Sequence, residues 1–148
     1  MSMIALNPAR PGFSTISSCL IVENQGQQLE FIKNVFCPEI TEPVKTDPDG
    51  RAALKIGNTS LIVVKADGDW PARTSTLYVY VKNISETYMK AMGAKAVALF
   101  EPKERYNGDQ ECSFKDSSGN LWVCAKFEKQ LSLDEMMERL KSQGISSS

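Results

Sequence analysis

The chain has 148 residues, the size of one ordinary domain, and this length allows a core that needs neither a metal nor a disulfide. Its 17 basic and 18 acidic residues nearly balance, which argues against a nucleic-acid partner. The four cysteines form no Cys-x-x-Cys motif, and there is neither a signal-peptide pattern nor a run of about 18 apolar residues. We therefore expect a soluble, cytoplasmic protein without a membrane partner.

The first half of the chain predicts one strand, a helix and three more strands. Residues 1–15 hold two prolines without a sustained period and are expected to form an extended arm. A short β-compatible run at residues 16–23 precedes Asn24, which forms a capping-box variant with Gln27 and begins a helix that ends before Pro38. The three further strands are expected around residues 43–45, 52–56 and 60–65, the first two joined by a turn at residues 47–50.

The second half repeats this order and adds a tail. Residues 74–81 are rich in Thr, Tyr and Val and predict a strand, Asn83 and Glu86 predict a capping box, and Gly93 is expected at a left-handed C-cap. Further strands are expected at residues 97–100, 110–115 and 121–127, with turns at residues 107–108 and 117–120. Residues 131–144 predict a C-terminal helix with one apolar face.

Short matches in the same order suggest an internal duplication. They pair residues 22–24 with 81–83, 42–43 with 101–102, 49–50 with 107–108 and 61–65 with 122–126. Each match falls at an equivalent cap, turn or strand. Residues 16–66 and 74–127 are therefore predicted to be two tandem βαβββ modules of a single α+β domain.

Three segments carry a family resemblance: residues 19–22, residues 29–36, and residues 106–122 with their Asp-x-x-Gly-Asn-Leu-Trp ending. The pattern resembles the vicinal oxygen chelate superfamily, which includes glyoxalase I and the bleomycin-resistance proteins, and most of all its PhnB-like branch. The resemblance implies two modules that form a U-shaped mixed β-sheet around a cleft, with helices on the convex face and the ligand on the concave face. Two departures are Phe31-Ile32 where relatives usually have Phe-Tyr, and Ser117-Ser118 where they have Pro-Phe.

Enzymes of this superfamily hold a divalent metal with one side chain from the first and last strand of each module. The resemblance transfers these four positions to Ser17, Ile62, Thr76 and Val123. Zinc, nickel, manganese and iron require imidazole or carboxylate ligands here, and the chain contains no histidine. We therefore expect no metal site and no cofactor.

Strand alternation and the resemblance together predict a cleft lined by apolar side chains and a few hydroxyls. Tyr78 and Tyr80 either hydrogen-bond a ligand or are half-buried packing residues, and Arg105 and Glu111 either rim the cleft or are solvated hairpin charges. Trp122 is interpreted as a core residue. The candidate ligand-binding residues are Ser17, Cys19, Ile62, Thr76, Tyr78, Tyr80, Arg105, Glu111, Leu121 and Val123.

Three functions remain open from the sequence. The first is a metal-free protein of glyoxalase or bleomycin-resistance type that binds a small, largely apolar organic molecule. The second is a metal-independent lyase, isomerase or transferase of the same fold, and the third is a non-catalytic interaction module with a filled cleft. A homodimer is expected because two short modules leave sheet edges that a second chain can cover.

Overall fold

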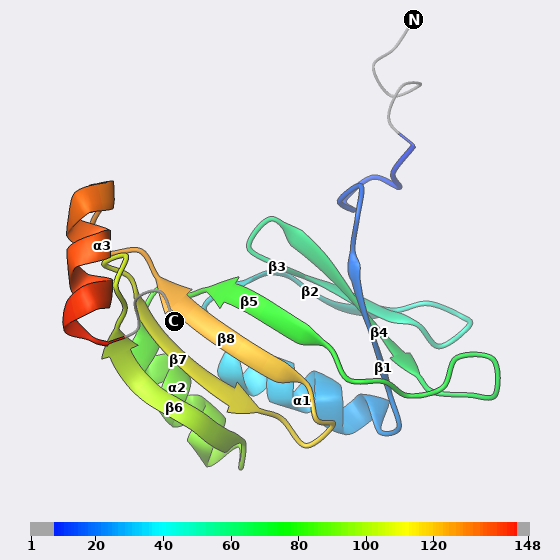
Figure 1. The fold of residues 1–148 in the computed structure, drawn as a ribbon. Coiled ribbons are helices and arrows are strands. Elements are labelled where there is room, and N and C mark those ends of the chain that lie inside the picture. Colours follow the sequence, from blue (N-terminus) through cyan, green and yellow to red (C-terminus); the bar gives the residue numbers. More distant parts are fainter. Residues whose placement is uncertain (1–7, 145–148) are drawn as a thin grey trace, which may run out of the picture. The chain divides into compact units, whose positions relative to one another are not determined.

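The computed structural model describes residues 8–144, and the chain divides into two compact units between Ser75 and Thr76. The first unit contains β1 (Ser18–Val22), α1 (Gln25–Val35), β2 (Ile40–Thr46), β3 (Ala52–Ile56) and β4 (Thr59–Lys65). Its four strands form one mixed sheet in the order β1-β4-β3-β2 (Figure 1). The β1–β4 pair is parallel and the other pairs are antiparallel.

The second unit repeats the same order of elements. It contains β5 (Thr76–Tyr80), α2 (Ile84–Gly93), β6 (Val97–Glu104), β7 (Gln110–Lys115) and β8 (Leu121–Lys126), followed by α3 (Leu133–Ser142). The sheet order β5-β8-β7-β6 and its single parallel pair, β5 with β8, match the first unit strand for strand. The protein is thus an α+β chain of two βαβββ modules with a C-terminal helix, as the internal matches predict. No helix within residues 8–144 is long and apolar enough to span a membrane.

Each unit buries one face of its sheet under its own helix. In the first unit, α1 packs on β4 and buries Phe31, Ile32 and Val35. In the second, α2 packs on β6, β7 and β8 and buries Ile84 and Ala91. The strand residues on these covered faces are the alternate apolar ones, as strand geometry requires: Leu20, Val22, Leu61, Val63, Trp122 and Cys124 are all buried.

Helix starts follow the capping residues in the sequence, but one helix end differs from the prediction. The Asn24, Asn83 and Ser132 side chains accept hydrogen bonds from the amides of Gln27, Glu86 and Glu135. Gly93 was expected in a left-handed C-cap, and this prediction is wrong: Lys95 has the positive φ of 67°. The amide of Ala96 bonds Ala91 O and that of Lys95 bonds Met92 O, which is a Schellman motif displaced two residues beyond the glycine.

The outer strands β2 and β6 are longer than predicted. The sequence predicts strands around residues 43–45 and at residues 97–100, yet β2 spans seven residues and β6 eight, and each contains a proline, Pro43 or Pro102. Both are edge strands, where a missing amide donor is tolerated, and both show irregular register beside the proline. The same feature therefore recurs at the equivalent edge of each module.

The two β-hairpins that follow these strands share one hydrogen-bond pattern. In the first unit the amide of Asp47 bonds Arg51 O and that of Gly50 bonds Asp47 O. In the second the amide of Arg105 bonds Asp109 O and that of Gly108 bonds Arg105 O. This geometric repeat supports the duplication independently of the residue matches.

The predicted N-terminal arm, residues 1–15, is described only from residue 8 onward; residues 1–7 lie outside the described part. Its second half docks on the first sheet. The amide of Ser14 donates to Ser60 Oγ at 3.0 Å, and the amide of Ser60 donates to Ser14 Oγ at 3.3 Å. The arm therefore contributes structure to the first unit.

Candidate functional site

The second sheet carries aromatic and charged side chains on the face opposite α2. Cross-strand partners share a face, so the register places side chains in rows. One row runs Tyr78, Val123, Ser113 and Phe100 from β5 to β6. The next runs Tyr80, Ala125, Glu111 and Lys103. Tyr78 is 51% exposed and Tyr80 is 62% exposed, whereas Ala125 between the larger Tyr80 and Glu111 is fully buried.

Three predicted site residues contact one another on this face. The Tyr78 hydroxyl donates a hydrogen bond of 2.6 Å to Glu111 Oε2, and Arg105 Nε lies 3.6 Å from Glu111 Oε1. The Glu111 side chain is only 13% exposed, so its carboxylate is held from both sides in a partly desolvated position. Tyr80 packs edge-on against Tyr78 with ring centroids 5.6 Å apart.

The electrostatics suit binding better than proton transfer by Tyr78. Burial of the hydroxyl raises the pKa of Tyr78, and the hydrogen bond to the Glu111 carboxylate raises it further. A tyrosine whose pKa lies above its ordinary value of about 10 stays protonated near neutral pH and makes a poor general base. Its hydroxyl acts as a fixed donor.

Phe100 and Lys103 extend the site, and the sequence did not single them out. Lys103 Nζ lies 4.4 Å from the centroid of the Phe100 ring, and the Arg105 guanidinium lies 5.9 Å from the same ring. Both residues belong to the part of β6 near Pro102, and Lys103 lies beyond the predicted end of this strand. An edge strand tolerates a proline, so the predicted strand could have been extended past Pro102. Strand alternation would then have placed Lys103 on this face.

The remaining predicted residues fall on both sheets. Thr76 pairs with Leu121 in the second, next to the row of Tyr78 and Val123. Cys19 pairs with Ile62 in the first, and Ser17 directly precedes β1. Burial raises the pKa of the Cys19 thiol, although Arg51 partly offsets this, so the thiol stays protonated at neutral pH.

The four positions transferred from the metal enzymes do not suit a divalent metal. Ser17 and Thr76 offer hydroxyls, and Ile62 and Val123 offer no donor atom. Within residues 8–144, no three His, Cys, Asp or Glu side chains gather so that they could hold a metal ion.

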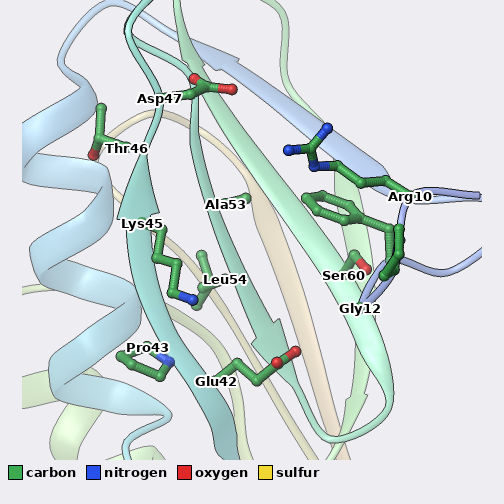
Figure 2. Close-up of a pocket in the computed structure, with 12 residues that line it drawn as sticks. Arg10, Gly12, Glu42, Pro43, Lys45, Thr46, Asp47, Ala53, Leu54 and Ser60 are labelled. Atoms are coloured by element: carbon green, nitrogen blue, oxygen red, sulfur yellow. The ribbon is translucent and has the colours of Figure 1, made fainter.

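The first unit contains a pocket that the sequence did not predict. It has a volume of about 430 Å³ and lies between the docked arm and strands β2, β3 and β4 (Figure 2). Its wall is formed by Arg10, Pro11, Gly12 and Phe13 from the arm, and Ala53 and Ser60 lie on the sheet side. No periodicity or motif in residues 8–14 signals this docking, which depends on a contact 46 residues away along the chain.

The most specific sequence motif of the resemblance is structural. Asp116 is buried; its Oδ1 accepts the amides of Ser118 and Asn120, and its Oδ2 accepts Trp122 Nε1 at 2.8 Å. Trp122 itself is fully buried under α2, as interpreted from its strand parity. The motif therefore closes the β7–β8 turn and anchors the core.

Comparison with solved structures assigns the architecture. TioX from Micromonospora sp. ML1 superposes with a TM-score of 0.63 at 16% identity, covering 78% of this chain and 99% of that chain. A glyoxalase/bleomycin resistance protein from Albidiferax ferrireducens T118 gives a TM-score of 0.63 at 15% identity over 76% of this chain and 98% of its own. The chain has the fold of the glyoxalase and bleomycin-resistance proteins.

A third structure supports the same fold over a larger part of the chain. A glyoxalase/bleomycin resistance protein/dioxygenase from Nocardioides gives a TM-score of 0.57 at 15% identity, covering 87% of this chain and 95% of that chain. No family model and no curated protein matches the sequence. At these identities the likeness shows the fold alone, and function has to be inferred from the site.

Proposed function

We propose that the chain is a metal-free protein of this fold that binds a small, largely apolar organic molecule on the open face of its second sheet. The observation that carries the proposal is the exposed Tyr78–Tyr80 pair beside the partly desolvated Glu111 carboxylate, which Tyr78 and Arg105 hold. Exposed aromatic rings supply apolar contact area, and a few fixed polar groups orient the ligand. The Asp-x-x-Gly-Asn-Leu-Trp motif supports placement in the PhnB-like branch.

Screening by thermal shift and native mass spectrometry against small aromatic metabolites and drugs tests this proposal. Tyr80→Ala should weaken a bound aromatic ligand about ten-fold, since the loss of one buried aromatic contact costs about 1.4 kcal/mol or more. Phe127→Ala is the matched control, because Phe127 is also 60% exposed but follows the end of β8. Partners that are only proteins or nucleic acids would contradict the proposal.

The metal-free part of the proposal has a separate test. Added zinc, nickel or manganese should leave the melting temperature unchanged, because the four candidate positions lack imidazole and carboxylate groups. A metal that binds only the folded state would add about 2.7 kcal/mol to the free energy of unfolding at a metal concentration of 100 times its Kd. A saturable rise that disappears in Thr76→Ala would show that a metal is bound.

A metal-independent lyase, isomerase or transferase is the second candidate. The raised pKa of Tyr78 removes this residue as a base near neutral pH and leaves Glu111 as the carboxylate in contact with it. Loss of turnover in Glu111→Gln, with unchanged folding and ligand affinity, would favour an enzyme. The third candidate, an interaction module with a filled face, is disfavoured by the exposure of Tyr78 and Tyr80.

We also propose a cytoplasmic homodimer. Cys112 and Cys124 are buried cross-strand neighbours that are not disulfide-bonded, which suits a reducing compartment. For the dimer, α3 has no buried residue, and its Leu133 and Met137 are 71% and 51% exposed. An apolar helix face of this kind is suited to contact a second copy.

A further inference from the structure

The pocket of the first unit has the dimensions of a small-molecule site. Its volume of about 430 Å³ lies within the range of about 300–1,000 Å³ that such sites occupy. All its lining residues belong to the first unit. It therefore shares no residue with the tyrosine face of the second sheet.

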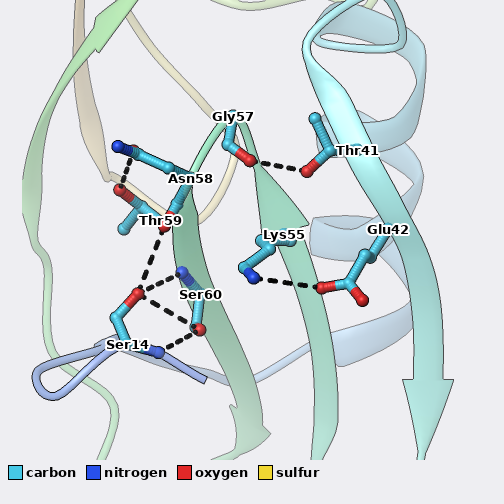
Figure 3. A network of polar contacts seen from close by, with 8 residues as sticks. All are labelled: Ser14, Thr41, Glu42, Lys55, Gly57, Asn58, Thr59 and Ser60. Carbon is cyan, nitrogen blue, oxygen red and sulfur yellow. Dashed lines mark hydrogen bonds and ion pairs between the residues drawn. The ribbon is translucent and has the colours of Figure 1, made fainter. Parts of the chain in front are cut away.

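The arm is held in place as one wall of this pocket. The amide of Phe13 bonds Arg10 O at 2.9 Å, which closes a turn that contains Gly12 at a φ of 88°. The next residue, Ser14, is fixed to β4 through Ser60 and through the carbonyl of Asn58 at 3.3 Å (Figure 3). The turn thus presents Arg10 and Phe13 to the pocket from a tethered segment.

The charges around the pocket leave two cations available to a ligand. No ion pair within residues 8–144 involves Arg10 or Lys45, both of which line the pocket. Of the two acidic residues in the lining, Glu42 is already paired with Lys55 at 3.4 Å. Asp47 is the other, and Figure 2 shows it at the opposite end of the pocket from Glu42.

We propose that this pocket binds an organic carboxylate with a flat apolar body. The Arg10 guanidinium forms charge-assisted hydrogen bonds with the carboxylate, and the positive charge of Lys45, which Figure 2 shows in another part of the pocket, adds electrostatic attraction. The ring of Phe13 and the methyl group of Ala53 contact the apolar body. Asp47 excludes ligands with a second anionic group at its end of the pocket.

The test compares two probes of the same shape, 1-naphthoate and the neutral 1-naphthamide. Their dissociation constants are measured by fluorescence at low ionic strength, and the contacted amides are mapped by NMR. We expect 1-naphthoate to bind at least about ten-fold more tightly, because a hydrogen bond to a charged group contributes about 1.5–3 kcal/mol. Shifts should occur at Ser60 and Ala53. Equal affinities, or shifts confined to the second unit, would overturn the proposal.

Variants separate the contribution of the two cationic side chains to binding from that of the apolar wall. Arg10→Gln and Lys45→Gln should each reduce the preference for 1-naphthoate several-fold and leave 1-naphthamide unaffected. Lys33→Gln is the matched control for net charge, because Lys33 lies on α1 and pairs with Glu30 away from the pocket. Phe13→Ala should weaken both probes to the same degree. An unchanged preference in both Arg10→Gln and Lys45→Gln would refute the assignment.

The outcome is independent of the function proposed for the second sheet. If 1-naphthoate binding depends on Arg10 and not on Tyr80, this inference holds whatever the tyrosine face binds. If it depends on Tyr80 and not on Arg10, this inference fails and the proposed function gains support.

Discussion

At the scale of single residues, Asp116 is a buried polar side chain whose removal should cost considerable stability. Asp116→Ala leaves the indole of Trp122 and the amide of Asn120 without their buried acceptor, and unsatisfied buried donors cost about 1–3 kcal/mol each. We expect a loss of about 3 kcal/mol in the free energy of unfolding, measured by urea denaturation. Ser117→Ala in the same turn is the control. Equal losses in the two variants would show that the Asp116 contacts contribute little.

Tyr78 should titrate above its ordinary value, and Glu111 should be part of the cause. The phenolate absorbance of the wild type, minus that of Tyr78→Phe, isolates this group. In Glu111→Gln the pKa of Tyr78 should fall, because the carboxylate charge disappears. A wild-type Tyr78 that titrates near pH 10 would contradict the geometry of the site.

The same pKa shift predicts how stability depends on pH. The folded state holds the Tyr78 proton more tightly than the unfolded chain does. The stability that this contributes is therefore fully present below about pH 10 and is lost as the pH rises through the folded pKa. The difference in stability between the wild type and Tyr78→Phe should shrink in that window.

At the scale of elements, the end of α2 holds a correctable strain. Lys95 adopts the left-handed conformation that glycine adopts without cost, while Gly93 occupies a helical position where an added Cβ would meet nothing within 4 Å. Lys95→Gly should stabilise the protein by about 1 kcal/mol, and Gly93→Ala by about 0.5–1 kcal/mol. Lys95→Ala is the control, since it removes the charge and keeps the Cβ. A gain from Lys95→Ala equal to that from Lys95→Gly would exclude backbone strain as the cause.

The β6–β7 hairpin packs closely against the segment before α3, and adding one methyl group to the hairpin tests this contact. A Cβ on Gly108 would lie 2.8 Å from Lys129 O, whereas a Cβ on Gly50 in the equivalent hairpin meets nothing within 4 Å. Both glycines have a φ near +90°, so both alanine variants should lose about 1–3 kcal/mol from strain. Gly108→Ala should lose at least about 1 kcal/mol more. Equal melting temperatures for the two alanine variants would show that the segment before α3 does not pack against the β6–β7 hairpin.

At the scale of the whole molecule, the proposed homodimer depends on the exposed face of α3. The helix is attached to its own unit by Arg139, which donates to Glu104 Oε1 at 3.1 Å, yet its Leu133 and Met137 remain exposed. Leu133→Glu combined with Met137→Glu should convert a dimer to monomers, as measured by light scattering at tens of micromolar. Glu138→Gln, elsewhere on the helix, should leave the dimer intact. A monomeric wild type would refute the dimer, and a dimer that survives the double variant would place its interface elsewhere.

The order of elements and the covered faces of the sheets were predictable from the sequence because their signals are local. Caps such as Asn24 and Ser132 act within three residues, and strand alternation assigns Leu20 and Trp122 to the helix side without knowledge of the partner strand. The lengths of strands β2 and β6 were underestimated from the sequence. A strand tolerates a proline mainly where it lies at a sheet edge, and the sequence does not show which strands are edges.

The contacts of both candidate sites were decided only by the tertiary structure. Tyr78 meets Glu111 across 33 residues, and Ser14 meets Ser60 across 46 residues, and no local pattern records either contact. The sequence determined which side chains are available on the open faces, since alternation acts within each strand. Strand register and the docking of the arm decided which of them touch, because these depend on the packing of segments far apart in the chain.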